Sequence, residues 1–233
     1  MEVKVQEVYD EKGYREMARL RKVVSEKKTS TVYLVFKRCF DVCGSLCGIV
    51  VLAIPMIIIA SLIFLQDGHS PIYRHTRIGK GGKKFKLIKF RSMMANPPAL
   101  EDILTPEQME QYKKEFKIDN DPRITPIGNF IRRTSIDELP QMFNILIGDM
   151  SVIGPRPIVE KEIEWYGNKK NELLSVKPGL TGYWQAYARN NVGYENGERQ
   201  KMELYYVHNQ SLLLDVRIFF KTILSVLKKH GAQ

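Results

Sequence analysis

The feature that most constrains the fold of this chain is an uninterrupted apolar segment near its start. From Val42 to Leu65 there is no charged residue, and Ile49–Leu65 is almost purely apolar. As one helix these residues would extend about 36 Å at ~1.5 Å per residue, enough to cross a hydrocarbon core of ~30 Å. The segment begins well inside the chain and lacks a small-residue cleavage site, so it does not have the form of a signal peptide. The sequence therefore predicts a membrane helix.

Two features favour a helix that enters and leaves the membrane on the same side. Pro55 lies at the centre of the segment, where it removes a backbone hydrogen bond and bends a helix. Both flanks are basic, with Lys37 and Arg38 before the segment and Arg74–Arg91 after it. Basic flanks stay in the cytoplasm. We therefore expect a Pro-bent re-entrant helix over residues 31–66, and a Pro-kinked helix that spans the membrane remains the alternative.

The charge balance points to an anionic partner. The chain has 36 Lys+Arg against 26 Asp+Glu, a net charge of +10. The Arg74–Arg91 run supplies eight basic residues and no acid. A basic run that directly follows an apolar segment is typical of attachment to an anionic leaflet. The excess therefore favours membrane and phosphate binding, and we expect no nucleic-acid partner because no aromatic RNA-binding signature is present.

Composition and cysteine content exclude other classes. Hydrophobic residues make up 44% and charged residues 27% of the chain, as in soluble domains, so a polytopic membrane protein is excluded. The three cysteines, Cys39, Cys43 and Cys47, have no second cluster with which to form a disulfide framework. A reducing compartment that faces the cytosol is the better interpretation.

The rest of the chain reads as a charged N-terminal arm or helix over residues 1–30 and one small domain over residues 67–233. Alternation of basic and apolar residues predicts a strand over Lys83–Arg91. Helices are expected over Glu107–Phe116, Asn129–Arg133, Leu139–Leu146, Ile158–Trp165 and the tail Glu203–Lys229. The tail is amphipathic and basic, suited either to the membrane interface or to packing on the domain's own core. The fold class is therefore α/β and mostly helical.

Several apparent sites do not have the spacing that their chemistry requires. Gly79–Lys83 is rich in glycine and lysine but lacks the phosphate-loop spacing, so an ATP site is rejected. Asp119–Asn120–Asp121 has a form seen in metal-dependent glycosyltransferases, but Pro122 favours a structural turn. The four histidines have no metal-ligand spacing, so we expect no zinc site.

The stretch with the most chemical content contains two adjacent carboxylates, Asp137 and Glu138, at an expected helix start. Thr134 or Ser135 would supply the capping hydroxyl, and Arg132 lies just upstream. Acids in a first helical turn often only complement the helix dipole. Carboxylates can also bind Mg²⁺ or attack phosphorus, and arginines hold phosphate with two hydrogen bonds. Both interpretations stay open on these residues alone.

At these residues the sequence resembles the bacterial sugar transferases, the monotopic phosphoglycosyl transferases that begin lipid-linked glycan assembly. The resemblance runs from about Lys37 to Lys229. It is carried by ordered motifs: Lys37–Arg38–x–Phe40–Asp41, Arg77–x–Gly79–Lys80, Lys89–Phe90–Arg91–Ser92–Met93, Asp121–Pro122–Arg123–Ile124–Thr125, Thr134–Ser135–x–Asp137–Glu138–Leu139–Pro140–Gln141, Gly148–Asp149–Met150–Ser151, Gly154–Pro155–Arg156–Pro157, Pro178–Gly179–x–Thr181–Gly182 and Tyr205–Tyr206–Val207.

The resemblance implies a small cytosolic catalytic domain with interfacial amphipathic helices, at the cytoplasmic face of the bacterial inner membrane. Such enzymes form a phosphosugar ester on an aspartate from a UDP-sugar, release UMP, and pass the phosphosugar to undecaprenyl phosphate. This is the first membrane step of exopolysaccharide, O-antigen, capsule or glycoprotein glycan synthesis. The partners would be the UDP-sugar, undecaprenyl phosphate and inner-membrane lipid, and a homodimer is left open.

The resemblance also assigns residues. Asp137 would be the nucleophile, and Glu138 would help to bind Mg²⁺ or to position the acceptor, so that both carboxylates are candidate metal ligands. The remaining residues expected to bind substrate or phosphate are Arg132, Arg156, Pro155, Pro157, Lys89, Arg91, Arg189 and Glu203.

This sequence departs from the family pattern at three positions. Ile54 precedes the bend proline where serine is usual, Glu203 stands in place of aspartate, and His208 takes a position that is more often acidic. Because only about thirty residues precede the membrane segment, we expect the minimal catalytic form of the family. The alternative function is a non-catalytic, membrane-attached scaffold that binds anionic lipid.

Overall fold

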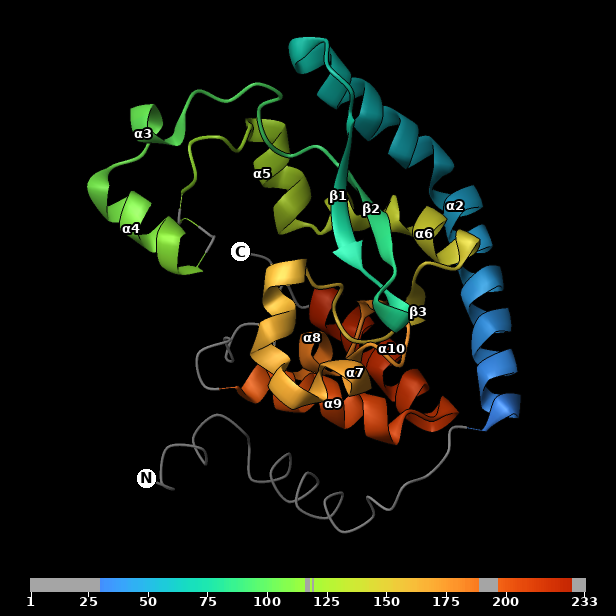
Figure 1. Ribbon diagram of the computed structural model, residues 1–233. Coiled ribbons are helices and arrows are strands. Elements are labelled where there is room, and N and C mark those ends of the chain that lie inside the picture. Colours follow the sequence, from blue (N-terminus) through green and yellow to red (C-terminus); the bar gives the residue numbers. More distant parts are fainter. Residues whose placement is uncertain (1–29, 116–117, 119, 189–196, 228–233) are drawn as a thin grey trace.

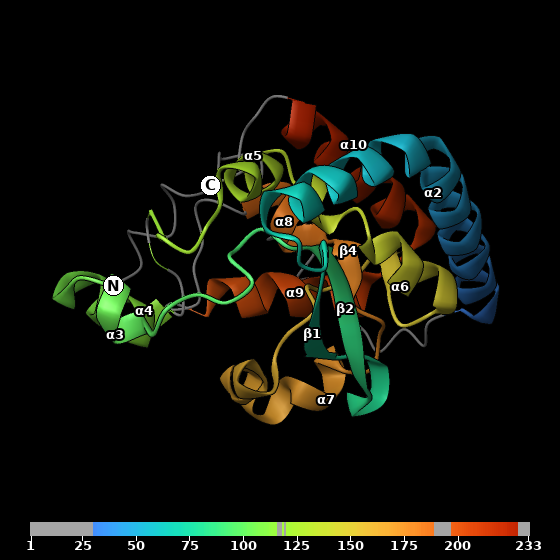
Figure 2. The ribbon, with the colours of Figure 1, turned by 90° about the horizontal axis from the view of Figure 1, so that it is seen from above.

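One long helix, α2, runs along one side of the described structure. The computed structural model describes residues 30–115, 118, 120–188 and 197–227. Helix α2 covers Thr31–Asp67 with Pro55 in its interior, and its axis changes direction along its length (Figures 1 and 2). In the described part of the chain it is the one helix long and apolar enough to cross a membrane. The helix expected over 31–66 is therefore present, whereas the arm expected over 1–30 lies outside the described residues except for Ser30.

The N-terminal part of α2 is bound to the folded domain by polar contacts. Lys37 forms an ion pair of 2.8 Å with Asp215. Arg38 donates hydrogen bonds to the last carbonyl groups of α6 (Gln141–Ile147), at Ile145 and Leu146. The buried Asp41 carboxylate accepts hydrogen bonds from the start of the strand β3 (Ser151–Ile153). These contacts hold the start of α2 against elements from the second half of the chain.

The C-terminal end of α2 is bound to the same domain. The Arg91 guanidinium makes two hydrogen bonds of 2.6 Å to the Asp67 carboxylate, and its Nε donates to the Ser70 carbonyl at 2.8 Å. Between the two ends, one face of the helix packs on the domain, where a Cβ at Gly48 would lie 2.7 Å from the Met142 sulfur. The opposite face exposes large apolar side chains: Val50, Val51, Ile54, Ile57 and Ile58.

An antiparallel hairpin leaves the end of α2. Its strands are β1 (Ile72–Ile78) and β2 (Lys84–Phe90), joined through the short turn η2 (Lys80–Gly82). Gly81 and Gly82 take positive φ angles of 68° and 79° in that turn, which glycine adopts without strain. The strand predicted over Lys83–Arg91 is confirmed. A second, parallel pair joins β3 to β4 (Gly179–Thr181).

Short helices make up most of the remaining structure, so the mostly helical class is confirmed. They are α3 (Leu100–Ile103), α4 (Pro106–Glu115), α5 (Pro126–Arg133), η3 (Ile136–Glu138), α6, η4 (Glu160–Lys169), α7 (Lys170–Leu173), α8 (Tyr183–Ala188), α9 (Glu198–Asn209) and α10 (Leu212–Leu227). Helix α6 lies between the hairpin and α2 (Figure 1). Helices α7 to α10 lie at the end of the hairpin that carries the turn η2, away from the C-terminal end of α2 (Figure 1).

Two helix predictions were wrong in form. The single tail helix expected over Glu203–Lys229 is two helices, because the chain is extended at Gln210 and the Ser211 hydroxyl accepts a hydrogen bond from Leu214 N at the start of α10. The helix expected over Ile158–Trp165 is the 3₁₀ segment η4, because Ile158 instead pairs with Ile78 of β1.

Candidate active site

The two carboxylates lie in η3, directly after a sharp change of chain direction. Ser135 precedes them with φ of +57°, in the left-handed region that residues with side chains rarely adopt. The expectation of a capping hydroxyl was wrong: Ser135 makes no cap bond, and the Thr134 hydroxyl donates back to the Phe130 carbonyl at 2.8 Å. The Thr134 hydroxyl is therefore bonded at the end of α5 and does not cap η3, which is a single turn of three residues.

Apolar packing joins this turn to α2. Ile136 and Leu139, which flank the two carboxylates, pack against a buried cluster that includes Met56 and Ile63 of α2. Phe90, at the end of β2, belongs to the same cluster. This packing holds the turn that carries the two carboxylates against the second half of α2.

Lys89 of β2 lies between the two carboxylates. Its Nζ is 2.7 Å from Glu138 Oε1 and 3.5 Å from Asp137 Oδ2. Burial raises the pKa of the Asp137 carboxyl above its usual value, and the neighbouring Glu138 carboxylate raises it further. The positive charges of Lys89 and Arg132 act in the opposite direction and favour the ionised form.

Arg132 presents its guanidinium to the same place from α5. Its Nε donates a hydrogen bond of 2.8 Å to the Ser92 hydroxyl, directly after β2. Burial lowers the pKa of the guanidinium, whereas the carboxylates of Asp137 and Asp121 raise it. The site thus brings together two carboxylates and two cations from three separate elements.

Arg91 lies on the same strand as Lys89 but is committed elsewhere. Its side chain is 9% exposed, and all three guanidinium nitrogens donate hydrogen bonds, chiefly to Asp67. Arg91 therefore links the end of α2 to the strand that carries Lys89.

The other predicted residues form a second cluster. Pro155 and Pro157 are buried, Arg156 is half-buried, and the Pro157 carbonyl accepts a hydrogen bond from Arg77 at 3.2 Å. The positive charge of Arg156 favours the ionised form of Glu203. Arg189 lies outside the described residues.

Glu203 is almost fully buried within this second cluster. Its carboxylate accepts hydrogen bonds from the Tyr166 hydroxyl and from Arg199 Nε, and its side chain is 1% exposed. Burial raises the pKa of the Glu203 carboxyl, although Arg199 opposes that shift. The Arg199 guanidinium also lies 4.1 Å from the centroid of the Trp184 ring. The buried Glu203 carboxylate is therefore paired with Arg199 and Tyr166, which indicates a structural role.

We expect Glu203→Ala to destabilise the protein by about 3–5 kcal/mol, because the substitution leaves the buried Arg199 guanidinium without this carboxylate. Chemical unfolding in detergent micelles measures the effect. Glu198→Ala, on the same helix, is the matched control because it removes an ion pair with the exposed Lys201 that is worth at most ~1 kcal/mol. Unchanged unfolding of Glu203→Ala would contradict this structural role of Glu203.

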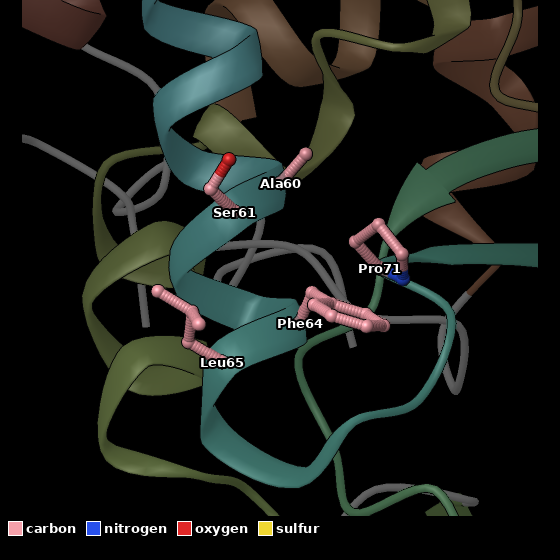
Figure 3. A pocket seen from close by; sticks show the side chains of 5 residues that line it. All are labelled: Ala60, Ser61, Phe64, Leu65 and Pro71. Carbon is pink, nitrogen blue, oxygen red and sulfur yellow. The ribbon is translucent and has the colours of Figure 1, made fainter.

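A shallow apolar groove of about 470 Å³ lies where α2 ends (Figure 3). Its lining consists of Ala60, Ser61, Phe64, Leu65 and Pro71. The Pro71 carbonyl accepts a hydrogen bond of 2.8 Å from Arg91 N. The groove therefore borders the end of the strand that carries Lys89.

Sequence reasoning assigned no role to Ser92 or Asp67. Ser92 belongs to the Lys89–Met93 motif, and Asp67 is the first charged residue after the apolar segment. The sequence around Ser92 does not indicate its partner Arg132, forty residues away, and the sequence around Asp67 does not indicate Arg91, twenty-four residues away. The turn favoured at Asp121 is present, since its carboxylate accepts hydrogen bonds from the backbone N and the guanidinium of Arg123. Asp119 lies outside the described residues.

The carboxylate pair suits one mode of magnesium binding. No group of three or more His, Cys, Asp or Glu side chains that could hold a metal occurs in the described ranges. Mg²⁺ is commonly held by one or two carboxylates together with substrate phosphates. The ammonium group of Lys89 lies against both carboxylates and neutralises part of their charge, so Mg²⁺ would share the pair with Lys89. Asp137 and Glu138 therefore fit Mg²⁺ when a phosphorylated substrate supplies the other oxygens.

Comparison with known proteins agrees with the ordered motifs. The model of the family described as "Bacterial sugar transferase" matches residues 32–229. The UDP-galactose-lipid carrier transferase of Erwinia amylovora is 47% identical over 84% of this chain and 41% of its own length. The undecaprenyl-phosphate galactose phosphotransferase of Salmonella typhimurium is 45% identical over 84% of this chain and 41% of its own length.

A relative of similar length also matches. The exopolysaccharide production protein ExoY of Rhizobium meliloti is 41% identical over 84% of this chain and 87% of its own length. The chain spans only 41% of the length of the Erwinia and Salmonella relatives. The family match nevertheless covers nearly every described residue. The chain belongs to the bacterial sugar transferase family.

Proposed function

We propose that this chain transfers a sugar phosphate from a UDP-sugar to undecaprenyl phosphate and releases UMP. The observation that carries the proposal is the carboxylate pair of η3, which packs on α2 and faces Lys89 and Arg132. The names of the relatives, which include an undecaprenyl-phosphate phosphotransferase and a lipid carrier transferase, support this substrate pair.

In the proposed first step, an Asp137 carboxylate oxygen attacks the phosphorus that bears the sugar. The bond between that phosphorus and the bridging oxygen breaks, and the oxygen leaves with UMP. In the second step an oxygen of the acceptor phosphate attacks the same phosphorus, the bond to Asp137 breaks, and the carboxylate is restored. Covalent catalysis of this kind divides one difficult transfer into two easier ones.

The neighbouring charges support these roles. A carboxylate that approaches a diphosphate is repelled unless cations compensate the charge, and stabilising charge in the transition state is the main task in phosphoryl transfer. Lys89 and Arg132 supply two such cations, and they also favour the ionised form of the buried Asp137. Glu138, which Lys89 contacts at 2.7 Å, would position the acceptor phosphate or its proton.

Asp137 and Glu138 would also hold Mg²⁺, which, when bound, neutralises phosphate charge and makes the phosphorus easier to attack. Arg156 would contact the nucleotide or a phosphate, close to Pro155 and Pro157. Arg91, which was expected to bind substrate or phosphate, would instead support the site through its ion pair with Asp67.

We further propose that α2 is re-entrant and that the catalytic domain lies at the cytoplasmic face of the inner membrane. Both ends of α2 contact one folded domain, through Lys37 and Arg38 at one end and Asp67 at the other. A helix that spans the bilayer would separate its ends by ~30 Å of hydrocarbon. The exposed apolar side chains around Pro55 would enter the membrane, and α10 would lie in the interface with its exposed Leu213 and Phe220.

This arrangement also provides a path for the acceptor. The hydrocarbon chain of undecaprenyl phosphate would lie along the exposed apolar face of α2 and its terminal groove. The acceptor phosphate would then reach the carboxylates at the depth of the lipid headgroups.

The proposal predicts that the purified protein releases UMP from one member of a panel of UDP-sugars when Mg²⁺ and undecaprenyl phosphate are present. Detection of UMP across the panel also identifies the sugar. Chelation of Mg²⁺ should abolish the release. A protein that binds anionic vesicles but releases no UMP from any UDP-sugar would be the membrane-attached scaffold instead.

A further inference from the structure

The hydroxyl of Ser92 has one partner in the site, and that partner is Arg132. Their Nε–Oγ distance is 2.8 Å, and Ser92 is 9% exposed. Within the described ranges, the two terminal nitrogens of Arg132 have no hydrogen-bond partner on the protein. With Nε bound, the end of the guanidinium formed by those two nitrogens is the part left for an anion, and that end suits two oxygens of one phosphate.

The backbone of Ser92 is fixed against α5, the helix that carries Arg132. The Ser92 carbonyl accepts a hydrogen bond from Thr125 N at 3.2 Å. A Cβ at Gly128 would lie 1.8 Å from the Ser92 oxygen, so only glycine permits this approach. Gly128 and Arg132 are four residues apart and therefore share one face of the helix. The hydroxyl is thus held at a set position relative to the guanidinium that it binds.

The carboxylate of Asp121 competes with that of Asp137 for the Arg132 guanidinium that the Ser92 hydroxyl binds. Arg132 is attracted by both Asp137 and Asp121. Asp121 is already paired with Arg123, through hydrogen bonds of 2.8 Å and 2.6 Å. Without the Ser92 hydroxyl, the long Arg132 side chain would regain rotamers that turn it away from Asp137. An arginine side chain carries ~2 kcal/mol of rotamer entropy.

We propose that Ser92 is a positioning residue that holds the Arg132 guanidinium with its two terminal nitrogens directed to a substrate phosphate. The inference rests on the proposed function, because it takes that phosphate to belong to the UDP-sugar or to the polyprenyl phosphate. Ser92 itself touches no substrate in this scheme, and its effect passes through Arg132.

A double-mutant cycle on binding tests the proposal without the need for turnover. The variants are Ser92→Ala, Arg132→Lys and the pair together, and the probes are UDP and farnesyl phosphate, measured by calorimetry on the full chain in detergent. Ser92→Ala should weaken binding of one probe about tenfold, as expected for a hydrogen bond to a charged group. In the Arg132→Lys background it should cause no further loss, because lysine has no Nε for Ser92 to hold. The probe that shows this coupling identifies whether donor or acceptor phosphate is bound.

Two further variants separate positioning from a general structural role. Ser92→Thr keeps the hydroxyl and should bind the same probe within about twofold of wild type. Ser70→Ala removes a hydroxyl that bonds only to Ile72 in the described structure, and it should bind both probes as wild type does. Additive losses in the cycle, or no loss in Ser92→Ala, would overturn the proposal. UMP release by wild type is scored separately, so that failure of the proposed transfer reaction is distinguishable from failure of Ser92 as a positioning residue.

Discussion

Asp137→Asn is expected to abolish both UMP release and the covalent adduct that forms when enzyme and UDP-sugar are mixed without acceptor. Asparagine keeps the size of the side chain but removes the nucleophilic oxygen charge, so the rate should fall on the order of 10³-fold or more. The fold should persist, because the substitution also removes a partly desolvated charge whose pKa burial raises. Intact-protein mass spectrometry with UDP-sugar and Mg²⁺ measures the adduct directly.

Two further variants test whether the effect is specific to Asp137. Glu138→Gln should reduce turnover strongly yet still allow some adduct, if its role belongs to the transfer to the acceptor. Asp102→Asn, on the exposed helix α3, is the matched surface control and should behave as wild type. A phosphosugar mass that persists in Asp137→Asn would place the nucleophile elsewhere. Turnover by wild type without any adduct would favour direct transfer between the two substrates.

The elements that sequence predicted best are those whose residues carry a local signal. The long apolar helix α2 follows from an apolar run that no charge interrupts, and β2 follows from the alternation of Phe85 and Leu87 with lysines. The end of α6 follows from Gly148, which takes φ of +95°. In each case the physical cause lies within a few residues of the feature that it determines.

The features that sequence missed depend on distant partners. β1 has four polar residues in succession, Arg74 to Arg77, and is a strand because β2 pairs with it along its whole length. β3 has only three residues, and its pairing with β4 depends on the close approach of Gly154 to Gly179. Neither signal is visible in a local window.

The candidate site shows the same division. Adjacent acids beside an arginine predicted the candidate stretch once the family resemblance was added, but the left-handed Ser135 and the hydrogen bond from Arg132 to Ser92 could not be inferred from those residues. Glu203 is the opposite case. Its position in the family pattern suggested substrate binding, and its described contacts are with Tyr166 and Arg199.

Both ends of α2 are expected to lie on the cytoplasmic side of the membrane. In a background in which Cys39, Cys43 and Cys47 are replaced by serine, single cysteines at Ser30 and Lys80 should react with a membrane-impermeant reagent only after the cells are opened. A cysteine at Val51, which is 74% exposed on the apolar face of α2, should react poorly in both conditions because lipid covers it. Reaction of Ser30→Cys and Lys80→Cys from opposite sides would establish a spanning helix.

The ion pairs at the two ends of α2 support the same sidedness more strongly than the basic flanks do. A spanning arrangement would break either the Lys37–Asp215 pair or the Asp67–Arg91 pair, whose distances are 2.8 Å and 2.6 Å, because Asp215 and Arg91 belong to the same folded domain. Pro55→Leu relieves a helix-interior cost of ~3 kcal/mol and so favours a straight helix. Because both pairs oppose the straight form, Pro55→Leu should move only a fraction of molecules to opposite sidedness. Asp67→Ala added to Pro55→Leu releases one end and should increase that fraction.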